Sequence, residues 1–146
     1  MEYEQLKLSN QVCFPIYAAS RLITRAYQPL LEKLDLTYPQ YLVLMVLWEN
    51  DRVSVNEITH KLILNTNTVT PLLKRMEVQG LITRKRSEKD ERSMVISLTK
   101  KGLNLQEQAA EIPMQLAGKL DVDDLSIDEI IDLRDKLNHL IQAIKN

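Results

Sequence analysis

Residues 69–102 read VTPLLKRMEVQGLITRKRSEKDERSMVISLTKKG, and this stretch decides the fold. A helix is predicted to run up to Gly80, because glycine directly after a helix is a common stop. Two strand-like runs, 81–86 and 93–98, then flank the polar loop SEKDER. The pattern predicts a helix followed by a β-hairpin.

Upstream of that helix, the sequence predicts a helix-turn-helix. A capping box begins at Thr37 and opens a helix over about 39–50. The letters SVNE form a second capping box, which opens a short helix over 55–62. The next helix begins in the polar turn LNTNT, 64–68. In this central part, three helices thus precede the hairpin.

Helices are also predicted on both sides of this central part. The first, 6–34, has apolar residues at helical spacing. Another runs from Lys100 to about Lys119 and bends at Pro113. A last helix starts in the capping box SIDE, 126–129, and its apolar residues cover roughly half of the helix circumference. Such a stripe is wider than one small domain easily covers.

The order of these elements predicts a mainly α-helical fold with a small β-hairpin wing. A winged helix-turn-helix at about 39–99 would lie between helices at about 6–34 and 100–146. At 146 residues, the chain fits one domain, 1–146, with a core of its own.

Composition narrows the class of protein. The hydrophobic share of 45% and the charged share of 27% are those of a globular chain. No apolar run of membrane-spanning length and no signal peptide is present in the sequence, so we expect a cytoplasmic protein with no membrane partner. A single cysteine, Cys13, can form no internal disulfide and stays a thiol in that compartment unless it is oxidised.

Charge is unevenly distributed along the chain. Residues 61–101 carry 10 basic and 4 acidic side chains, a net charge of +6. The flanks are acidic: −2 over 1–60 and −5 over 102–146. Ordinary scatter of solvated charge is one interpretation. A localised surface that binds anions is the one favoured here.

Candidate contacts to DNA lie in this basic block. The second helix of a helix-turn-helix enters the major groove, and a thin hairpin tip reaches the minor groove, where arginine is attracted. The candidates on the helix are Asn65, Thr66, Asn67, Thr68, Thr70, Lys74 and Arg75, and those on the wing are Arg84, Arg86, Lys89, Asp90 and Arg92. We expect Asp90 to orient the Arg92 guanidinium through a bidentate pair.

The segments DERSMVISLTKKG and VTPLLKRMEVQGLITR resemble the wing and the recognition helix of MarR-family winged-helix repressors. This resemblance covers essentially the whole chain. It implies a transcriptional repressor that binds palindromic double-stranded DNA as a homodimer. The helices at about 6–34 and 100–146 would then be dimerisation helices, and a partner chain would cover the wide apolar stripe.

The first helix carries an unusual seam. Cys13, Tyr17, Ser20, Thr24, Tyr27 and Leu31 share one face, and five of these six side chains bear a thiol or a hydroxyl. Cys13 and Tyr27 lie ~21 Å apart along one helix and cannot touch within a chain, but they could touch if the helix packs against an antiparallel copy. From the residues alone, Cys13 is either a small buried hydrophobe or a reactive group read across a dimer interface.

The segments CFPIYAASR, with Tyr27 beyond it, and LTYPQYLVLMVLWE resemble the OhrR branch of the MarR family, the organic-hydroperoxide sensors. The resemblance implies that Cys13 is the redox-sensing residue and that Tyr17, Tyr27 and Tyr38 orient its thiolate. With no second cysteine, the chain matches the one-cysteine type, in which a low-molecular-weight thiol completes the switch. Oxidation of Cys13 would release the operator.

Two other functions stay open. A MarR-type regulator can instead be released by a small aromatic ligand, with Cys13 structural. A thiol peroxidase is the alternative from another class, but no resolving cysteine exists, and the spacing of His60 and His139 suggests no catalytic triad. We expect no enzyme activity, no cofactor and no metal.

Overall fold

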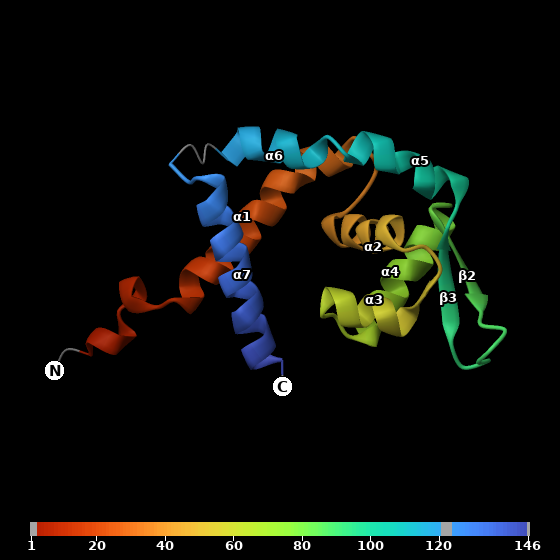
Figure 1. Cartoon of the computed structure of the whole chain (residues 1–146), viewed down its shortest axis with the longest axis horizontal. Helices are drawn as coiled ribbons and strands as arrows, with labels where there is room; N and C mark the ends of the chain where they lie inside the picture. The colour runs from red at the N-terminus through yellow and green to blue at the C-terminus, as the bar shows by residue number, and fades with distance from the viewer. Residues whose placement is uncertain (1–2, 121–123, 146) are drawn as a thin grey trace. The chain divides into compact units, whose positions relative to one another are not determined.

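The structure is a computed structural model that describes residues 3–120 and 124–145. Its helices and strands follow one another as shown in Figure 1. The chain divides into two compact units, Met1–Leu116 and Ala117–Asn146. The first contains the sheet and the hydrophobic core, and the second consists mainly of one helix. The predicted single domain stays a prediction.

The helix-turn-helix is present as predicted. It consists of α2 (Tyr38–Glu49), α3 (Val55–Leu62) and α4 (Thr66–Val78). Both predicted capping boxes are formed, with Thr37 before α2 and Ser54 before α3. These helices supply half of the buried apolar side chains of the first unit.

The wing is a β-hairpin of β2 (Ile82–Arg86) and β3 (Met94–Leu98). The strands are antiparallel, with Arg84 opposite Ile96. A third strand, β1 (Val53–Ser54), pairs with the other edge of β3, which gives the order β1-β3-β2. The sequence analysis missed β1, because two residues carry no alternation from which a strand can be recognised.

Several contacts fix the base of the wing. Gly80 has φ +75°, and the Leu81 N–H donates to the Met76 carbonyl at 3.0 Å, which ends α4 in the way predicted. The Thr99 hydroxyl lies 2.6 Å from the Gly80 carbonyl, to which it donates. Gly102 packs so closely on the Leu81 carbonyl that a Cβ there would overlap it. The wing is therefore anchored at both of its ends.

The N-terminal helix begins later than predicted. Residues 4–10 form two short 3₁₀ turns, η1 (Glu4–Leu6) and η2 (Leu8–Asn10), and α1 spans Cys13–Glu32. The expected start at residue 6 was wrong because Pro15 would then lie inside the helix, where it lacks an N–H and clashes with the preceding turn. With α1 starting at Cys13, Pro15 falls in the first turn, where its missing N–H costs nothing.

The predicted helix from Lys100 to about Lys119 is two helices. The structure has α5 (Lys100–Ala109) and α6 (Ile112–Leu120), separated at residues 110–111. Pro113 is the second residue of α6 and not a bend within one helix. A proline in the first turn of a new helix is favourable, whereas inside a helix it removes a hydrogen bond.

The second unit contains α7 (Ile127–Ile144), which starts at the predicted capping box of Ser126 and Glu129. None of its residues is buried within the chain. Its apolar stripe includes Ile127, Ile130, Ile131, Leu133, Leu140, Ile141 and Ile144, all of them exposed. In the part of the chain that the structure describes, no helix has the length and hydrophobicity needed to cross a bilayer.

Candidate nucleic-acid interface and thiol site

The start of α4 presents short polar side chains. Asn65 is the N-cap: its Oδ1 accepts from the Thr68 N–H at 2.9 Å and from the Thr68 hydroxyl at 3.1 Å. Asn65 and Thr68 therefore hold the helix start in place. Thr66 and Asn67 are exposed between them and carry no side-chain hydrogen bond within the described residues. These two side chains are free to reach a ligand.

The other candidates on α4 lie further along the helix. Thr70 is half-buried, whereas Lys74 and Arg75 are exposed. Lys74 and Arg75 line an open hollow of 620 Å³ together with Glu32 and Asp35 of the α1–α2 region. Basic side chains thus follow the polar start of α4 about two turns later.

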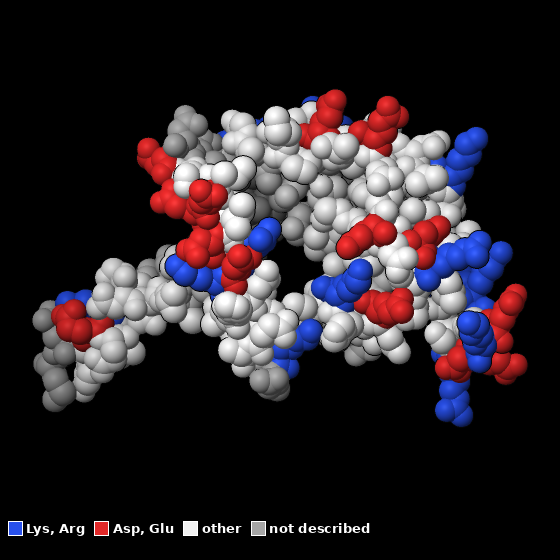
Figure 2. Space-filling view, in the orientation of Figure 1, with Lys and Arg blue, Asp and Glu red and all other residues white. Residues whose placement is uncertain are grey.

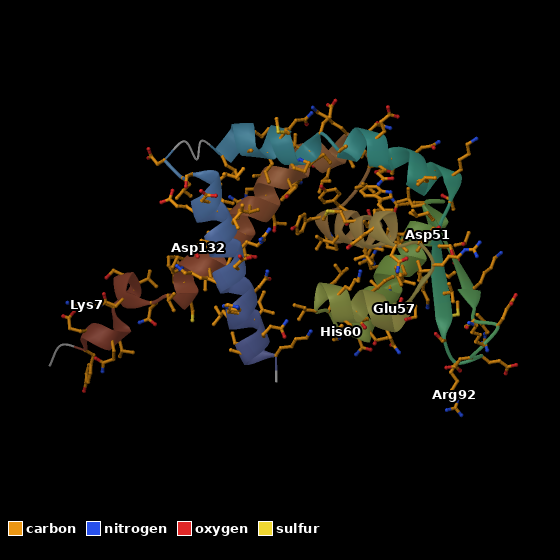
Figure 3. All side chains as sticks on the ribbon, viewed as in Figure 1. Lys7, Asp51, Glu57, His60, Arg92 and Asp132 are labelled. Carbon is orange, nitrogen blue, oxygen red and sulfur yellow. The ribbon has the colours of Figure 1, made fainter. Side chains whose placement is uncertain are left out.

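The tip of the wing carries both basic and acidic side chains, and its turn is well defined. Arg86, Lys89 and Arg92 are exposed. The Asp90 carboxylate accepts from the backbone N–H of Arg92 at 3.0 Å, and no ion pair joins these two side chains among the described residues. The expected bidentate pair is therefore replaced by a turn of the kind that aspartate forms with the backbone two residues on. Figure 3 shows the Arg92 side chain projecting away from the hairpin.

Arg84 differs from the other wing candidates. Its side chain is half-buried and forms an ion pair with Glu77 of α4 at 3.3 Å. The predicted contact between Arg84 and DNA therefore stays a prediction, and the structure gives the residue another partner. Glu77 was missed by the sequence analysis, since nothing in its spacing to Arg84 signals a pair between a helix and a strand.

Basic side chains gather at the wing end of the first unit. Figure 2 shows blue side chains over β2 and β3, with the acidic residues of the hairpin tip among them. The structure thus gathers the basic block 61–101 around α4 and the hairpin. Such a surface attracts a polyanion.

Cys13 is the first residue of α1 and is exposed in the chain. Val12 precedes it as the N-cap and makes no capping bond through its side chain. The positive end of the helix dipole therefore lies at Cys13, and it favours an anion there. One turn later, the Tyr17 ring packs against the Arg21 guanidinium, whose carbon lies 4.6 Å from the ring centroid.

The other two predicted tyrosines lie together at the opposite end of α1. The ring centroids of Tyr27 and Tyr38 are 4.8 Å apart, and Tyr41 lies 5.9 Å from Tyr27. Burial, together with the nearness of the Tyr38 and Tyr41 phenols, raises the pKa of Tyr27. Burial likewise raises the pKa of Tyr38 and, with the nearby Tyr38 phenol, that of Tyr41. These groups are neutral hydroxyl donors near pH 7.

Tyr41 was not among the predicted site residues. Its signal was present in the sequence, since Tyr38 and Tyr41 are three apart on one helix and three-residue spacing places side chains together. Tyr41 is 3% exposed and connects the tyrosines to Trp48, 6.3 Å away. The Trp48 indole N–H donates to the Gly102 carbonyl at 3.0 Å.

The structure brings Tyr27 and Tyr38 together but keeps Cys13 away from them. α1 is helical from Cys13 through Glu32, so Cys13 and Tyr27 are separated by ~21 Å along its axis. A thiol site that includes Tyr27 and Tyr38 therefore needs a second chain.

The first half of α1 offers a surface for such a chain. Its buried residues are Leu30 and Leu31 alone, both near its end. Earlier in the helix, apolar side chains are exposed, among them Phe14 (42%), Tyr17 (62%) and Leu22 (58%). Contiguous exposed apolar surface on a globular protein is typical of an interface.

Comparison with known proteins identifies the family. The family described as transcriptional regulator SarA/Rot matches residues 25–109. The organic hydroperoxide resistance transcriptional regulator of Bacillus subtilis is 54% identical over 117 residues, which are 80% of each chain. The chain belongs to the MarR family of winged-helix transcriptional regulators.

Solved structures agree with this MarR-family assignment. The structure of reduced AbfR bound to DNA has a TM-score of 0.84 and 36% identity, and it covers 100% of both chains. Overoxidized AbfR bound to DNA has a TM-score of 0.80 and 35% identity over 99% of each chain. AbfR is a protein of Staphylococcus epidermidis. The predicted winged-helix fold is confirmed.

Proposed function

We propose that this MarR-family chain is a DNA-binding transcriptional repressor that senses organic hydroperoxides by oxidation of Cys13. The observation that carries the proposal is the position of Cys13. It is exposed at the positive end of α1, in a chain 54% identical to an organic hydroperoxide resistance regulator. The two AbfR structures on DNA, one reduced and one overoxidized, support both halves of the proposal.

The chemistry starts with nucleophilic attack by the Cys13 thiolate on the peroxide. The sulfur attacks the terminal oxygen of ROOH, and the O–O bond breaks. The leaving alkoxide takes a proton from water, so the products are the Cys13 sulfenic acid and the alcohol ROH. A low-molecular-weight thiol R′SH then condenses with the sulfenic acid, which gives a mixed disulfide and water. Sulfur is oxidised in the first step, and the peroxide is reduced.

The partner chain completes the site. In an antiparallel pairing of α1 helices, Tyr27 and Tyr38 of one chain hydrogen-bond the Cys13 thiolate of the other. Both phenols are protonated donors, because burial raises their pKa. A bulky adduct on Cys13 of one chain then pushes away Tyr27 and Tyr38 of the other chain, and the two subunits shift relative to each other. The two recognition helices lose the spacing of about 34–36 Å that half-sites one turn apart require.

The DNA contacts follow from the exposed polar groups. We assign Thr66 and Asn67 at the start of α4 to the major groove, and Arg86, Lys89 and Arg92 to the wing contact. The operator is a palindrome, because a homodimer presents two identical heads. The protein acts in the cytoplasm, and its role is regulatory and not enzymatic.

A DNA-shift assay with and without an organic hydroperoxide tests the proposal. The DNA probe is a duplex selected for binding from a random-sequence pool by the reduced protein. Wild type should bind this duplex and release it on treatment, whereas Cys13→Ser should bind equally well and ignore the peroxide. Release that persists in Cys13→Ser contradicts sensing by Cys13 and leaves DNA binding standing.

The same assay separates the other functions. If a small aromatic acid releases the DNA and a hydroperoxide does not, the chain is a ligand-controlled regulator. Catalytic turnover of hydroperoxide with a thiol reductant would make it a peroxidase. Light scattering at low micromolar concentration checks the dimer, and a stable monomer would remove the cross-chain thiol site.

A further inference from the structure

The carboxylate of Glu77, at the end of α4, binds both the backbone and the side chain of Arg84 in β2, the first strand of the wing. Glu77 Oε2 accepts from the backbone N–H of Arg84 at 3.1 Å. Glu77 Oε1 accepts from Arg84 Nε and from Arg84 Nη2, both at 3.3 Å. The pair therefore fixes both the path of β2 and the direction of the guanidinium.

The backbone contact has a structural cause. β2 is an outer strand of the sheet, because the strand order is β1-β3-β2. An outer strand leaves every second N–H without a partner in the sheet. The N–H of Arg84 is one of these groups, and Glu77 takes the place of the missing strand. The carboxylate is thus the link between α4 and the edge of the wing.

The alternation of β2 directs the Arg84 side chain toward α4. Ile82, Arg84 and Arg86 point to one face of the strand, since successive side chains alternate. Ile82 is 1% exposed and belongs to the core, whereas Arg86 is exposed. Arg84 lies between them, at the boundary of the core, with its side chain 21% exposed. This position suits a contact within the protein better than one with a phosphate.

Glu77 is also a surprising residue for a DNA-binding surface. It is one of four acidic side chains in the basic block 61–101. Near a polyanion, a carboxylate lowers the affinity for that polyanion, unless it has a structural role that offsets the repulsion. Neutralisation by Arg84 and control of the wing angle give it such a role.

We propose that Glu77 and Arg84 form a positioning pair that sets the wing at a fixed angle to the recognition helix, so that both reach the same DNA site. Arg84 then acts through Glu77 and is not itself a DNA contact. This inference rests on the proposed DNA-binding function. It deepens that function by separating the residues that touch DNA from those that position them.

The proposal and simple electrostatics predict opposite changes in DNA affinity for the substitution Glu77→Ala. Glu77→Ala removes a negative charge near DNA, which by itself strengthens binding. If Glu77 positions the wing, the same substitution weakens binding. Alanine is the best helix former, so α4 itself is not harmed. Glu88→Ala is the matched control, because it removes the same charge from an exposed position on the hairpin.

The experiment measures the affinity for the selected duplex over a salt series, for wild type, Glu77→Ala, Arg84→Ala, the double variant and Glu88→Ala. We expect each single variant to bind on the order of tenfold more weakly, and the double variant to bind no more weakly than either one, because both remove one interaction. The salt dependence of Arg84→Ala should match that of Glu77→Ala, because both variants lose the same wing contacts. Glu88→Ala should bind as wild type does or more tightly.

Hydroxyl-radical footprinting adds a readout that loss of stability alone does not change. In both single variants, protection of the minor groove by the wing should be lost, while protection by α4 stays. Thermal unfolding confirms that each variant is folded at the assay temperature.

Three results overturn the pairing. They are tighter or unchanged binding by Glu77→Ala, additive losses in the double variant, or a salt slope for Arg84→Ala that is smaller by about 1 than that of Glu77→Ala, as expected if Arg84 itself contacts a phosphate. Failure of wild type to select any duplex is a separate outcome, which removes the proposed DNA-binding function together with this pairing.

Discussion

The phenol rings of Tyr27, near the end of α1, and Tyr38, at the start of α2, lie with their centroids 4.8 Å apart. Burial raises the pKa of both groups. Two neighbouring hydroxyl donors thus lie where α1 meets α2, and in the proposed dimer they hydrogen-bond the Cys13 thiolate of the second chain.

Removing one hydroxyl from this pair should slow the switch without affecting DNA binding. In the proposed thiol site, a tyrosine donor stabilises the Cys13 thiolate, and the reaction with peroxide needs the thiolate. We therefore expect Tyr27→Phe and Tyr38→Phe to bind the selected duplex like wild type and to release it more slowly after hydroperoxide. The exposed Tyr3→Phe serves as the control. Wild-type release rates in both variants would mean that the phenols do not act on the sulfur.

Stability should fall at alkaline pH because of the same phenols. Their pKa is raised in the folded chain, so the unfolded chain ionises first, at a pH of about 10. Stability is thus fully present below that pH and is lost as the pH rises through the folded pKa. Tyr27→Phe and Tyr38→Phe should flatten the decline of the unfolding midpoint between about pH 9 and 11. An unchanged decline would place its origin elsewhere.

Arg92 projects from the wing tip, while Asp90 holds its backbone N–H. We expect Arg92→Ala to weaken DNA binding by ~1–3 kcal/mol, as loss of a groove contact does. Affinity should also fall steeply with salt. Lys119→Ala, on α6, removes the same charge outside the wing and should have little effect. Binding that resists both Arg92→Ala and added salt would contradict the winged-helix contact.

Ile63, at the end of α3, has a left-handed backbone, φ 55°, although its side chain is branched at Cβ. The side chain is 51% exposed, so little packing compensates for the strain. Ile63→Asn should raise the free energy of unfolding by about 1 kcal/mol, since asparagine tolerates this conformation. Ile63→Val keeps the branched Cβ and should give no such gain. Thermal unfolding of both variants at one protein concentration makes the comparison.

The chain offers two helical glycines with opposite surroundings. A Cβ on Gly102 of α5 would overlap the Leu81 carbonyl, whereas a Cβ on Gly118 of α6 meets nothing within 4 Å. We expect Gly102→Ala to destabilise by ~1–3 kcal/mol, as overpacking does. Gly118→Ala should stabilise by about 0.5–1 kcal/mol through helix propensity. Equal effects of the two substitutions on the unfolding midpoint would contradict this close approach.

The elements that follow from local chemistry could be predicted from the sequence. The capping boxes at Thr37, Ser54 and Ser126 set three helix starts, because each box involves four neighbouring residues. Gly80 likewise marks the end of α4. Proline positions were recognised, but the boundaries they set were misplaced at the start of α1 and between α5 and α6. At these two places, the boundary depends on whether it is more favourable to continue one helix or to end it and start another.

Long-range pairing could not be predicted. β1 exists because β3 offers it an edge, and two residues carry no signal of their own. The pair of Glu77 and Arg84 depends on how the strand turns back on α4. In the thiol site, the types of residue were recognisable from the resemblance. The contact between Tyr41 and Tyr27 depends on how α1 packs against α2, which no local spacing indicates.

Trp48 is the one tryptophan of the chain, and it lies edge-on to Tyr41 while its indole N–H is bonded to the Gly102 carbonyl. An indole in this position gives the protein an optical probe of its own. Its emission depends on that hydrogen bond, and excitation of the neighbouring phenols transfers energy to it. A displacement of the tyrosine cluster can therefore be followed by fluorescence in real time, on unlabelled protein and without DNA.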